Sequence, residues 1–305
     1  MRILTYTVTP EEDGRMVKGI LRGSLQLSYT LLKSLKWREN AILLNGQSVH
    51  VNAIVHAGDV VSVALSERTP REDLYCANAA KPDIVYEDDD LLVLNKPAGV
   101  AMHPKSGDAS ASSLAAMLTS YLGEGSVPHF VSRLDKGTSG LLIAAKNGYV
   151  HDRLRRALHS SDLRREYRAV AVGRVEPPCG VIEGIPAQPE GVIDAPIGRA
   201  EGSIIRRCVR TDGLPSLTEY ETLQVNDRFT LLRLRPQTGR THQLRVHMAY
   251  LGHPLAGDWL YGTEDKTLIA RPALHSYELL FTQPVTGLEL HFTAPIPQDM
   301  QRLME

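Results

Sequence analysis

The sequence is poor in cysteine, tryptophan and phenylalanine. Its three cysteines, Cys76, Cys179 and Cys208, stand far apart, and none belongs to a Cys-x-x-Cys pair. This spacing argues against a zinc site and a disulfide framework, and it predicts a reducing, cytoplasmic compartment. With 2 tryptophans and 4 phenylalanines among 305 residues, the core must be mainly aliphatic.

Long apolar runs and a dominant sign of charge are also missing. No stretch approaches the roughly 18 apolar residues of a membrane span. The N-terminus has no apolar signal region before Glu11, Glu12 and Asp13. We therefore expect no membrane association. The formal net charge is −1, so any site for nucleic acid has to be a local basic patch.

The first 66 residues predict a small α+β domain. Apolar residues at helical spacing run through residues 15–40 among lysines and arginines. Residues 41–49 predict a strand, an Asn-Gly turn and a second strand, and another turn and strand follow over residues 55–63. Residues 67–81 are polar and mixed, which is typical of a linker, and they leave residues 82–305 as a second domain.

The second domain begins with a predicted hairpin over residues 84–96. We expect its acidic turn, Asp88-Asp89-Asp90, to be solvated rather than to bind metal. Further elements follow from the spacing of apolar residues and from turn residues. The predicted helices are 112–122, 149–160 and one that stops at Gly252. The predicted strands are 165–173, a pair within 177–198, 216–225, 229–235 and 288–294.

One carboxylate stands in a polar turn that precedes a short apolar run. The turn is Ser132-Arg133-Leu134-Asp135-Lys136-Gly137-Thr138-Ser139-Gly140, and residues 141–145 are apolar. The cations at Arg133 and Lys136 favour the ionised form of Asp135, which suits a nucleophile or a base. A solvated turn aspartate is the alternative when the Arg-Leu-Asp tripeptide is considered alone.

Three segments, in order, resemble the motifs of the RluA-type pseudouridine synthases. They are Asn95-Lys96-Pro97-Ala98-Gly99-Val100, the turn around Asp135, and Thr238-Gly239-Arg240-Thr241-His242-Gln243-Leu244-Arg245-Val246-His247 with the tail Gly252-His253-Pro254 and Gly257-Asp258-Trp259-Leu260-Tyr261-Gly262. Arg165-Glu166-Tyr167-Arg168-Ala169 resembles a fourth family motif, basic-x-Tyr-x-Ala. The resemblance implies an α+β fold, in which a mixed and largely antiparallel sheet is flanked by helices.

The resemblance also implies roles for individual residues. Asp135 would attack either C1′ of the ribose or C6 of uracil, and Arg245 or Arg240 would hold its carboxylate ionised. Tyr167 and Leu244 would sandwich the base. Arg133 would fill the space that a flipped uridine leaves. The remaining implied contacts to RNA are Lys96, His242, Arg155, Arg156 and Arg165.

The chain departs from the family at one position, because Ser132 stands where the family usually has histidine before Arg-Leu-Asp. Since the family chemistry depends on the aspartate, we expect activity to survive. The isomerisation involves no redox change and no group transfer, so we expect no cofactor. His242, His247 and His253 are five and six residues apart and do not share a helix face, so we expect no metal.

Residues 12–65 resemble the S4 RNA-binding module, with two basic helices leading into the Asn-Gly hairpin. The resemblances together predict a monomeric cytoplasmic pseudouridine synthase that acts on structured RNA, with ribosomal RNA as the expected substrate. One alternative is a catalytically silent protein that binds structured RNA. A nucleoside or phosphate-ester hydrolase ranks lower, because the sequence has no Walker loop, no G-x-S-x-G elbow and no metal-ligand spacing.

Overall fold

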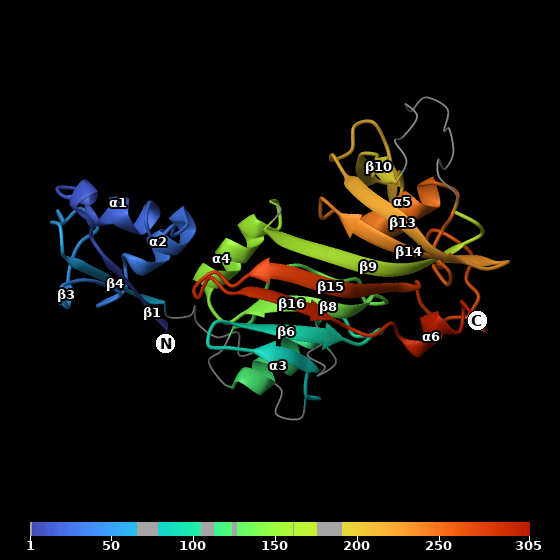
Figure 1. Ribbon diagram of the computed structural model, residues 1–305, viewed down its shortest axis with the longest axis horizontal. Helices are drawn as coiled ribbons and strands as arrows, with labels where there is room; N and C mark the ends of the chain where they lie inside the picture. The colour runs from blue at the N-terminus through green and yellow to red at the C-terminus, as the bar shows by residue number, and fades with distance from the viewer. Residues whose placement is uncertain (1, 66–78, 105–112, 124–126, 161, 176–190) are drawn as a thin grey trace.

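The computed structural model describes residues 2–65, 79–104, 113–123, 127–160, 162–175 and 191–305 (Figure 1). Within these residues, no helix is long and apolar enough to cross a membrane. The chain forms a small N-terminal unit and a larger unit built on one extended sheet.

The N-terminal unit is a four-stranded antiparallel sheet with two short helices. The strand order is β1 (Arg2–Thr7), β4 (Val60–Leu65), β2 (Ile42–Leu44) and β3 (Gln47–Ser48). The helices are α1 (Val17–Arg22) and α2 (Tyr29–Leu35), and the Ser28 hydroxyl caps α2 by accepting a hydrogen bond from the Leu31 amide. The two predicted helices and the Asn-Gly hairpin are therefore confirmed. Strand β1 was not predicted from the sequence.

The larger unit contains a ten-stranded sheet. Its main strand order is β10 (Val192–Asp194), β13 (Leu217–Val225), β14 (Phe229–Pro236), β9 (Leu163–Val172), β15 (Leu274–Thr282), β8 (Ser139–Ala145), β6 (Leu91–Lys96) and β5 (Ile84–Glu87). β16 (Glu289–Thr293) pairs with β15, and β7 (His129–Phe130) pairs with β8. The sheet is antiparallel except where β15 runs parallel to β8. A mixed, largely antiparallel sheet is thus confirmed.

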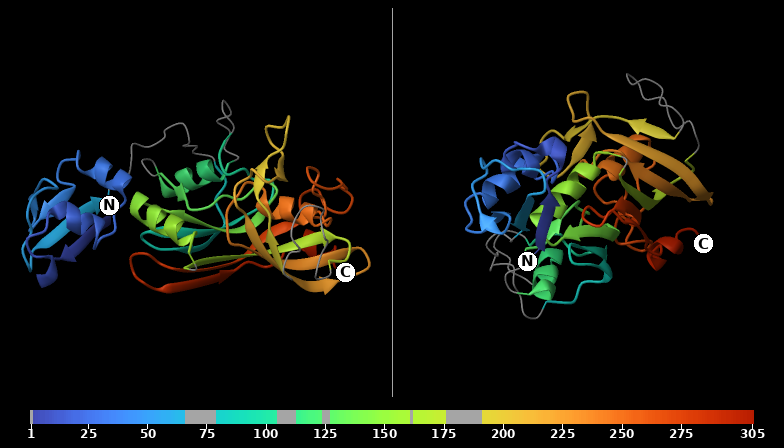
Figure 2. Two further views of the ribbon diagram at one scale, coloured as in Figure 1. Left: turned by 90° about the horizontal axis from the view of Figure 1, so that it is seen from above. Right: turned by 60° about the vertical axis from the view of Figure 1, so that its left-hand side comes forward.

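Helices cover this sheet, and a separate hairpin projects beside it (Figures 1 and 2). The helices are α3 (Leu114–Leu122), α4 (Gly148–Ala157), α5 (Gln243–Tyr250) and the short α6 (Gln298–Gln301). The hairpin consists of β11 (Ile197–Arg199) and β12 (Arg207–Val209). The predicted elements over 84–96, 112–122, 149–160, 165–173, 216–225, 229–235 and 288–294 are confirmed to within a few residues. Residues 177–190 lie outside the described residues, so only β10 represents the strand pair predicted over 177–198.

Alternate residues of β6 and β8 belong to two different apolar clusters. Leu92 and Leu142 pack in the cluster that α3 and α5 complete. Leu91 and Leu141 belong to a cluster that continues through α4 into the N-terminal unit. Both faces of the central strands are therefore buried, which explains why β8 reads as a continuous apolar run instead of an alternating one.

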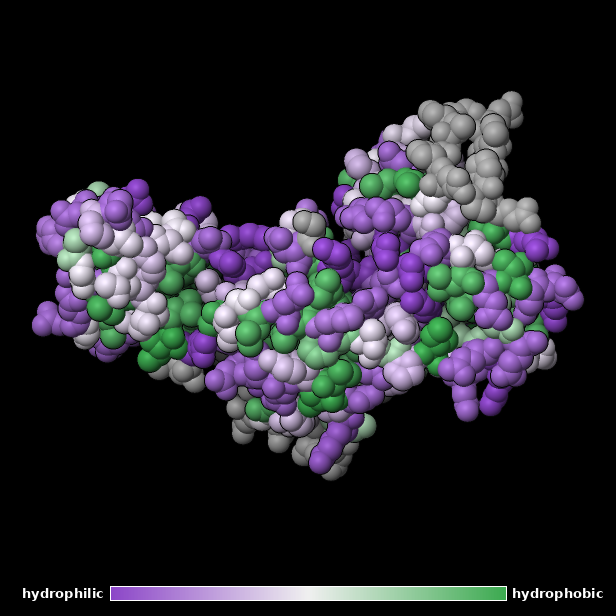
Figure 3. All heavy atoms as spheres, viewed as in Figure 1, coloured by the Kyte–Doolittle hydropathy of each residue, from purple (hydrophilic) through white to green (hydrophobic). Residues whose placement is uncertain are grey.

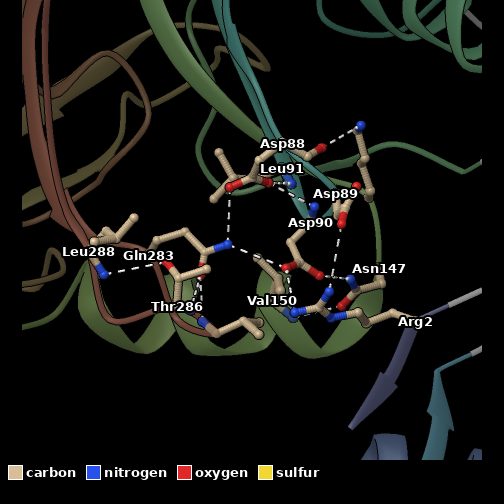
Figure 4. A network of polar contacts seen from close by, with 12 residues as sticks. Arg2, Asp88, Asp89, Asp90, Leu91, Asn147, Val150, Gln283, Thr286 and Leu288 are labelled. Carbon is tan, nitrogen blue, oxygen red and sulfur yellow. Dashed lines mark hydrogen bonds and ion pairs between the residues drawn. The ribbon is translucent and has the colours of Figure 1, made fainter.

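The acidic turn between β5 and β6 is a structural junction, so the expectation of a solvated turn was wrong (Figure 4). Asp90 is only 1% exposed. Asp88 accepts hydrogen bonds from the amides of Asp90 and Leu91 at 2.7 and 2.8 Å, and the Gln283 amide group donates to both carboxylates at 3.0 and 3.3 Å. Arg2 of β1 reaches Asp90 at 3.4 Å, so the turn also ties the N-terminal unit to the sheet.

Candidate active site

A cleft of about 360 Å³ opens where three elements meet: the loop before β8, the strand β9 and the start of α5. The motif segments of the sequence, far apart along the chain, supply most of its wall. The polar or charged residues that line it include Ser132, Arg133, Asp135, Arg155, Arg165, Arg240, His242 and Arg245, and the apolar or aromatic ones include Leu134, Tyr167, Leu244 and Leu274.

Backbone hydrogen bonds hold the loop that carries Asp135 in place. The Thr138 amide donates to the Asp135 carbonyl at 3.0 Å, and the Gly99 amide donates to the Lys136 carbonyl at 2.8 Å. Gly140, which follows the loop, has φ +106°, and a Cβ there would lie 2.2 Å from the carbonyl oxygen of Ser276. Only glycine fits this close approach of β8 to β15, which fixes the position of the loop.

Lys96 supports this loop from inside the protein, which corrects the expectation that it contacts RNA. Its side chain is completely buried. The ammonium donates to the carbonyls of Pro97, Val100 and Lys136 at 2.9, 3.0 and 3.3 Å. Burial lowers the pKa of Lys96 to about 8, although the charge of Asp135 opposes that shift. Lys96 of the Lys-Pro motif therefore stabilises the backbone of the loop that carries Asp135.

Arg245 of α5 is the arginine that pairs with Asp135, which settles the alternative that the sequence left open. Its Nη1 lies 3.2 Å from Asp135 Oδ2. Its Nε and Nη2 each donate to Asp258 at 2.7 Å, in a bidentate pair that is almost completely buried. Asp258 thus fixes the plane of the guanidinium, and one edge remains to face Asp135.

Arg240 lines the cleft but bonds elsewhere. Its Nε donates to the Pro215 carbonyl at 3.1 Å. Its backbone amide donates to the buried side chain of Gln243, which also accepts from the Thr238 hydroxyl at 2.8 Å. Gln243 in turn donates to Leu217 and Thr218 of β13. The Thr-Gly-Arg-x-His-Gln motif therefore forms a turn, and the hydrogen bonds of Gln243 attach this turn to β13 of the sheet.

His242 directly precedes α5 as its N-cap residue and adopts the left-handed conformation, with φ 59°. This backbone turns its imidazole toward the cleft, where Nε2 lies 3.8 Å from Asp135 Oδ2. On its other side, Nδ1 lies 2.8 Å from the hydroxyl oxygen of Tyr261. Burial lowers the pKa of His242, and the charge of Asp135 opposes this shift.

The remaining predicted residues divide between the cleft and the molecular surface. Tyr167 and Leu244 both line the cleft and are nearly buried within one apolar cluster. The exposed arginines Arg133 and Arg155 and the half-buried Arg165 also line it. Figure 3 shows hydrophilic residues along the concave surface between the two units.

Arg156 does not line the cleft. Its guanidinium pairs with Asp152 on α4 and donates to the carbonyl of Gln26 in the N-terminal unit at 3.4 Å. Its neighbour Arg153 also bonds Gln26. Arg156 therefore contributes a contact between the two units while its side chain stays 50% exposed, and its contact with RNA remains a prediction.

The histidines of the motif have separate surroundings. His247 is completely buried, with Nδ1 2.9 Å from the Thr218 hydroxyl and Nε2 3.0 Å from the Ala195 carbonyl, and burial lowers its pKa to about 4. His253 Nδ1 lies 3.0 Å from the Val172 carbonyl. Within the part of the chain that the structure describes, no group of three or more His, Cys, Asp or Glu side chains could hold a metal ion.

Two further polar residues, Asp258 and Tyr261, belong to this site, although no role was predicted for either of them from the sequence. Both belong to the segment Gly257-Asp258-Trp259-Leu260-Tyr261-Gly262, which follows the Gly-His-Pro tail. This segment resembles the end of the family motif, but a sequence does not show that Asp258 pairs with Arg245 or that Tyr261 contacts His242.

The chain is similar to known proteins over most of its length. Residues 90–250 match the family model described as RNA pseudouridylate synthase. The uncharacterized RNA pseudouridine synthase YjbO of Bacillus subtilis is 39% identical over 285 residues, covering 93% of this chain and 96% of that protein. Ribosomal large subunit pseudouridine synthase D of Vibrio cholerae is 38% identical over 315 residues, covering 97% and 92%.

A solved structure agrees with these relatives. Human RNA pseudouridylate synthase domain containing 1 superposes with a TM-score of 0.54 at 27% identity, covering 70% of this chain and 83% of that one. The family match spans the Asp135 loop, β9 and the whole of α5, which are the elements that form the cleft. The chain therefore belongs to the RluA-like family of RNA pseudouridine synthases and is an isomerase.

Proposed function

We propose that this protein converts uridine in ribosomal RNA to pseudouridine, with Asp135 as the nucleophile. The observation that carries the proposal is the pairing of Asp135 with Arg245 at 3.2 Å in the cleft. The guanidinium holds the Asp135 carboxylate in place in the cleft, where a carboxylate oxygen can act as a nucleophile.

The reaction breaks the bond between C1′ of the ribose and N1 of uracil, turns the base and forms a bond between C1′ and C5, while C5 loses its proton and N1 gains one. Asp135 starts this sequence by attack on C1′ or on C6 of the base. All atoms of the substrate are retained, so the enzyme has to hold the free base while it turns. Asp258 binds the Arg245 guanidinium at 2.7 Å on the edge that faces away from Asp135. Arg245 is therefore already in position before the reaction begins.

The base is proposed to enter between Tyr167 and Leu244. Support comes from the position of both side chains in the cleft wall, since an aromatic ring and an aliphatic side chain can both pack against the face of uracil. A paired uridine has to leave its helix to reach this site. Arg133, exposed at the rim on the same loop as Asp135, is proposed to occupy the space that the uridine leaves.

The N-terminal unit, residues 1–66, is proposed to be an S4-like RNA-binding domain. Support comes from four exposed cations on α1 and α2 and near them: Lys18, Arg22, Lys33 and Lys36. Exposed lysines and arginines on one unit supply phosphate contacts, which do not read sequence but do position the RNA. Arg153 and Arg156 on α4 face the same unit, so this surface continues toward Arg155 at the cleft.

Ribosomal RNA is proposed as the substrate because the similar protein of Vibrio cholerae carries the name of a large-subunit synthase. The competing proposal is a silent RNA-binding protein. The Asp135–Arg245 pair favours catalysis, because RNA binding alone gives no reason to keep a carboxylate among cations in the cleft.

The test is to map pseudouridines in total RNA from cells that have the gene and from cells that lack it. We expect one or a few ribosomal uridines to lose the modification and to regain it when the purified protein is added to the unmodified RNA. Loss of sites only in another class of RNA would contradict the substrate. An unchanged map in every class would favour the silent protein.

A further inference from the structure

Tyr261 lies behind the cleft and contacts two of the side chains that face Asp135. Its hydroxyl oxygen lies 2.8 Å from His242 Nδ1, and its ring centroid lies 5.1 Å from the guanidinium carbon of Arg245. Tyr261 does not belong to the cleft wall described above. Any effect of its hydroxyl on the reaction therefore passes through His242.

The hydrogen bonds of the Tyr261 hydroxyl determine which nitrogen of His242 carries the proton. The backbone amide of Arg207 donates to the hydroxyl oxygen at 3.0 Å. A phenol has one proton to donate, and among the described residues Nδ1 of His242 lies within hydrogen-bond distance to accept it. The reverse arrangement, with Nδ1–H donating, would leave the phenol proton without that acceptor, which is unfavourable for a half-buried hydroxyl.

Nε2 then carries the proton of the neutral imidazole. Burial lowers the pKa of His242, which favours the neutral ring. Nε2 lies 3.8 Å from Asp135 Oδ2, a distance too long for a hydrogen bond. The Nε2–H group therefore faces the cleft beside the carboxylate and can donate to a substrate atom.

We infer that Tyr261 is a positioning residue that holds neutral His242 as its Nε2–H tautomer, so that Nε2–H donates a hydrogen bond to a carbonyl oxygen of the uracil beside Asp135. The inference rests on the proposed reaction at Asp135. It adds the element that orients the base relative to the nucleophile, because uracil offers carbonyl oxygens as acceptors.

The first test is Tyr261→Phe, which removes the hydroxyl and keeps the ring that contacts Arg245. We expect kcat to fall about threefold to tenfold, as for the loss of one neutral hydrogen bond. The KM for RNA and its dependence on salt should stay unchanged, since the Tyr261 hydroxyl contacts none of the lysine and arginine side chains proposed to bind phosphate. Tyr250→Phe is the matched control, because the hydroxyl of Tyr250 is buried without a hydrogen-bond partner in the described structure, and its removal should change kcat less than about twofold.

The second test reads the tautomer directly and needs no substrate. Nitrogen NMR of the free enzyme, labelled at its histidines, should show Nδ1 of His242 unprotonated and Nε2 protonated, with the signals assigned by their loss in His242→Gln. In Tyr261→Phe the two tautomers should mix. A protonated Nδ1 in the wild-type protein would overturn the inference, even if the variant failed to fold.

The two measurements have to agree. A fall in kcat without a change of tautomer would mean that Tyr261 acts only on the packing of the site, and a change of tautomer with full kcat would mean that Nε2–H does not touch the reacting base. Either result would overturn the inference. A wild-type enzyme that forms no pseudouridine would instead reject the proposed function, while the NMR of the free enzyme would still report on Tyr261.

Discussion

Arg133 and Lys136 flank Asp135 in the sequence but face different surroundings. Arg133 lines the cleft, whereas the side chain of Lys136 is exposed outside it. We predict that Arg133→Ala lowers kcat/KM about tenfold or more on a target uridine that is paired in a duplex, because unpairing and unstacking cost a few kcal/mol. The loss should be less than about threefold on the same uridine in an unpaired loop.

The measurement compares paired and unpaired versions of one target RNA. Lys136→Ala is the control and should change both rates equally and little. Equal losses for Arg133→Ala on both RNAs would show that Arg133 does not assist base flipping.

The residues of the cleft could be predicted from the sequence where they belong to a family motif that contains the reacting groups. Asp135, Tyr167, Leu244 and Arg245 were all identified from the sequence, and the structure brings all four to one cleft. Lys96 was assigned incorrectly, because a sequence does not show that three carbonyls will converge on a lysine and bury it.

At the scale of elements, the contact between β8 and β15 determines where the Asp135 loop lies. Gly140→Ala would place a Cβ 2.2 Å from the Ser276 carbonyl oxygen at φ +106°. We predict a loss of more than about 3 kcal/mol in the free energy of unfolding, because the backbone has to move. Gly99→Ala is the control, with φ +87° and nothing within 4 Å, and it should cost only about 1–2 kcal/mol. Similar losses in urea unfolding would contradict this account of the β8–β15 contact.

Helix α5 is anchored by a buried neutral histidine, and this makes stability depend on pH. The pKa of His247 is lowered to about 4 in the folded protein, against about 6.5 in an unfolded chain. The unfolded chain therefore binds the proton first, and stability falls as the pH drops from about 6.5 toward 4. This group alone predicts a loss of about 2 kcal/mol between pH 7 and pH 5.

The measurement is the free energy of urea unfolding at both pH values for wild-type protein and for His247→Gln. The variant will be less stable at pH 7, but its loss on acidification should be smaller by that amount. The same decrease in both proteins would mean that His247 is not a buried neutral group.

Elements with clear periodicity or turn residues could be predicted, whereas β15 was missed. Its pairing with β9 contains an irregularity between Ser276 and Glu278, which breaks the regular alternation. It also buries His275 and Ser276, and His275 is satisfied by Ser139 and Ala294, which are distant in sequence. Such partners exist only once the sheet has formed.

At the scale of the whole molecule, the ion pair between Arg2 and Asp90 joins the two units. Asp90 is almost completely buried, and burial raises its pKa although Arg2 opposes the shift. We predict that Arg2→Ala lowers the free energy of unfolding by about 1–3 kcal/mol, because it leaves a buried carboxylate without its cation. This loss is smaller than the roughly 3–5 kcal/mol expected for a fully buried ion pair, because the Arg2 side chain is 31% exposed and solvent screens its charge.

The control is Asp89→Asn, which removes the other carboxylate near Arg2. Asp89 is 91% exposed at 3.8 Å from Arg2, so the change should stay within about 0.5 kcal/mol. If urea unfolding gave equal effects for the two variants, the junction would not be a stabilising contact. The sequence predicted two units but not this junction, since a run of three aspartates in a turn is usually solvated.

The central claim is that Asp135 is the nucleophile, and the most direct measurement is pseudouridine formation by purified Asp135→Asn on a defined ribosomal RNA target. The amide keeps the shape of the side chain but loses the negative charge and the nucleophilic oxygen. We predict that turnover falls below about a thousandth of wild type while RNA affinity stays within about twofold, with Ser132→Ala within about tenfold of wild type as the control for disturbance of the loop. Turnover by Asp135→Asn above that thousandth, from protein free of wild-type enzyme, would contradict the account.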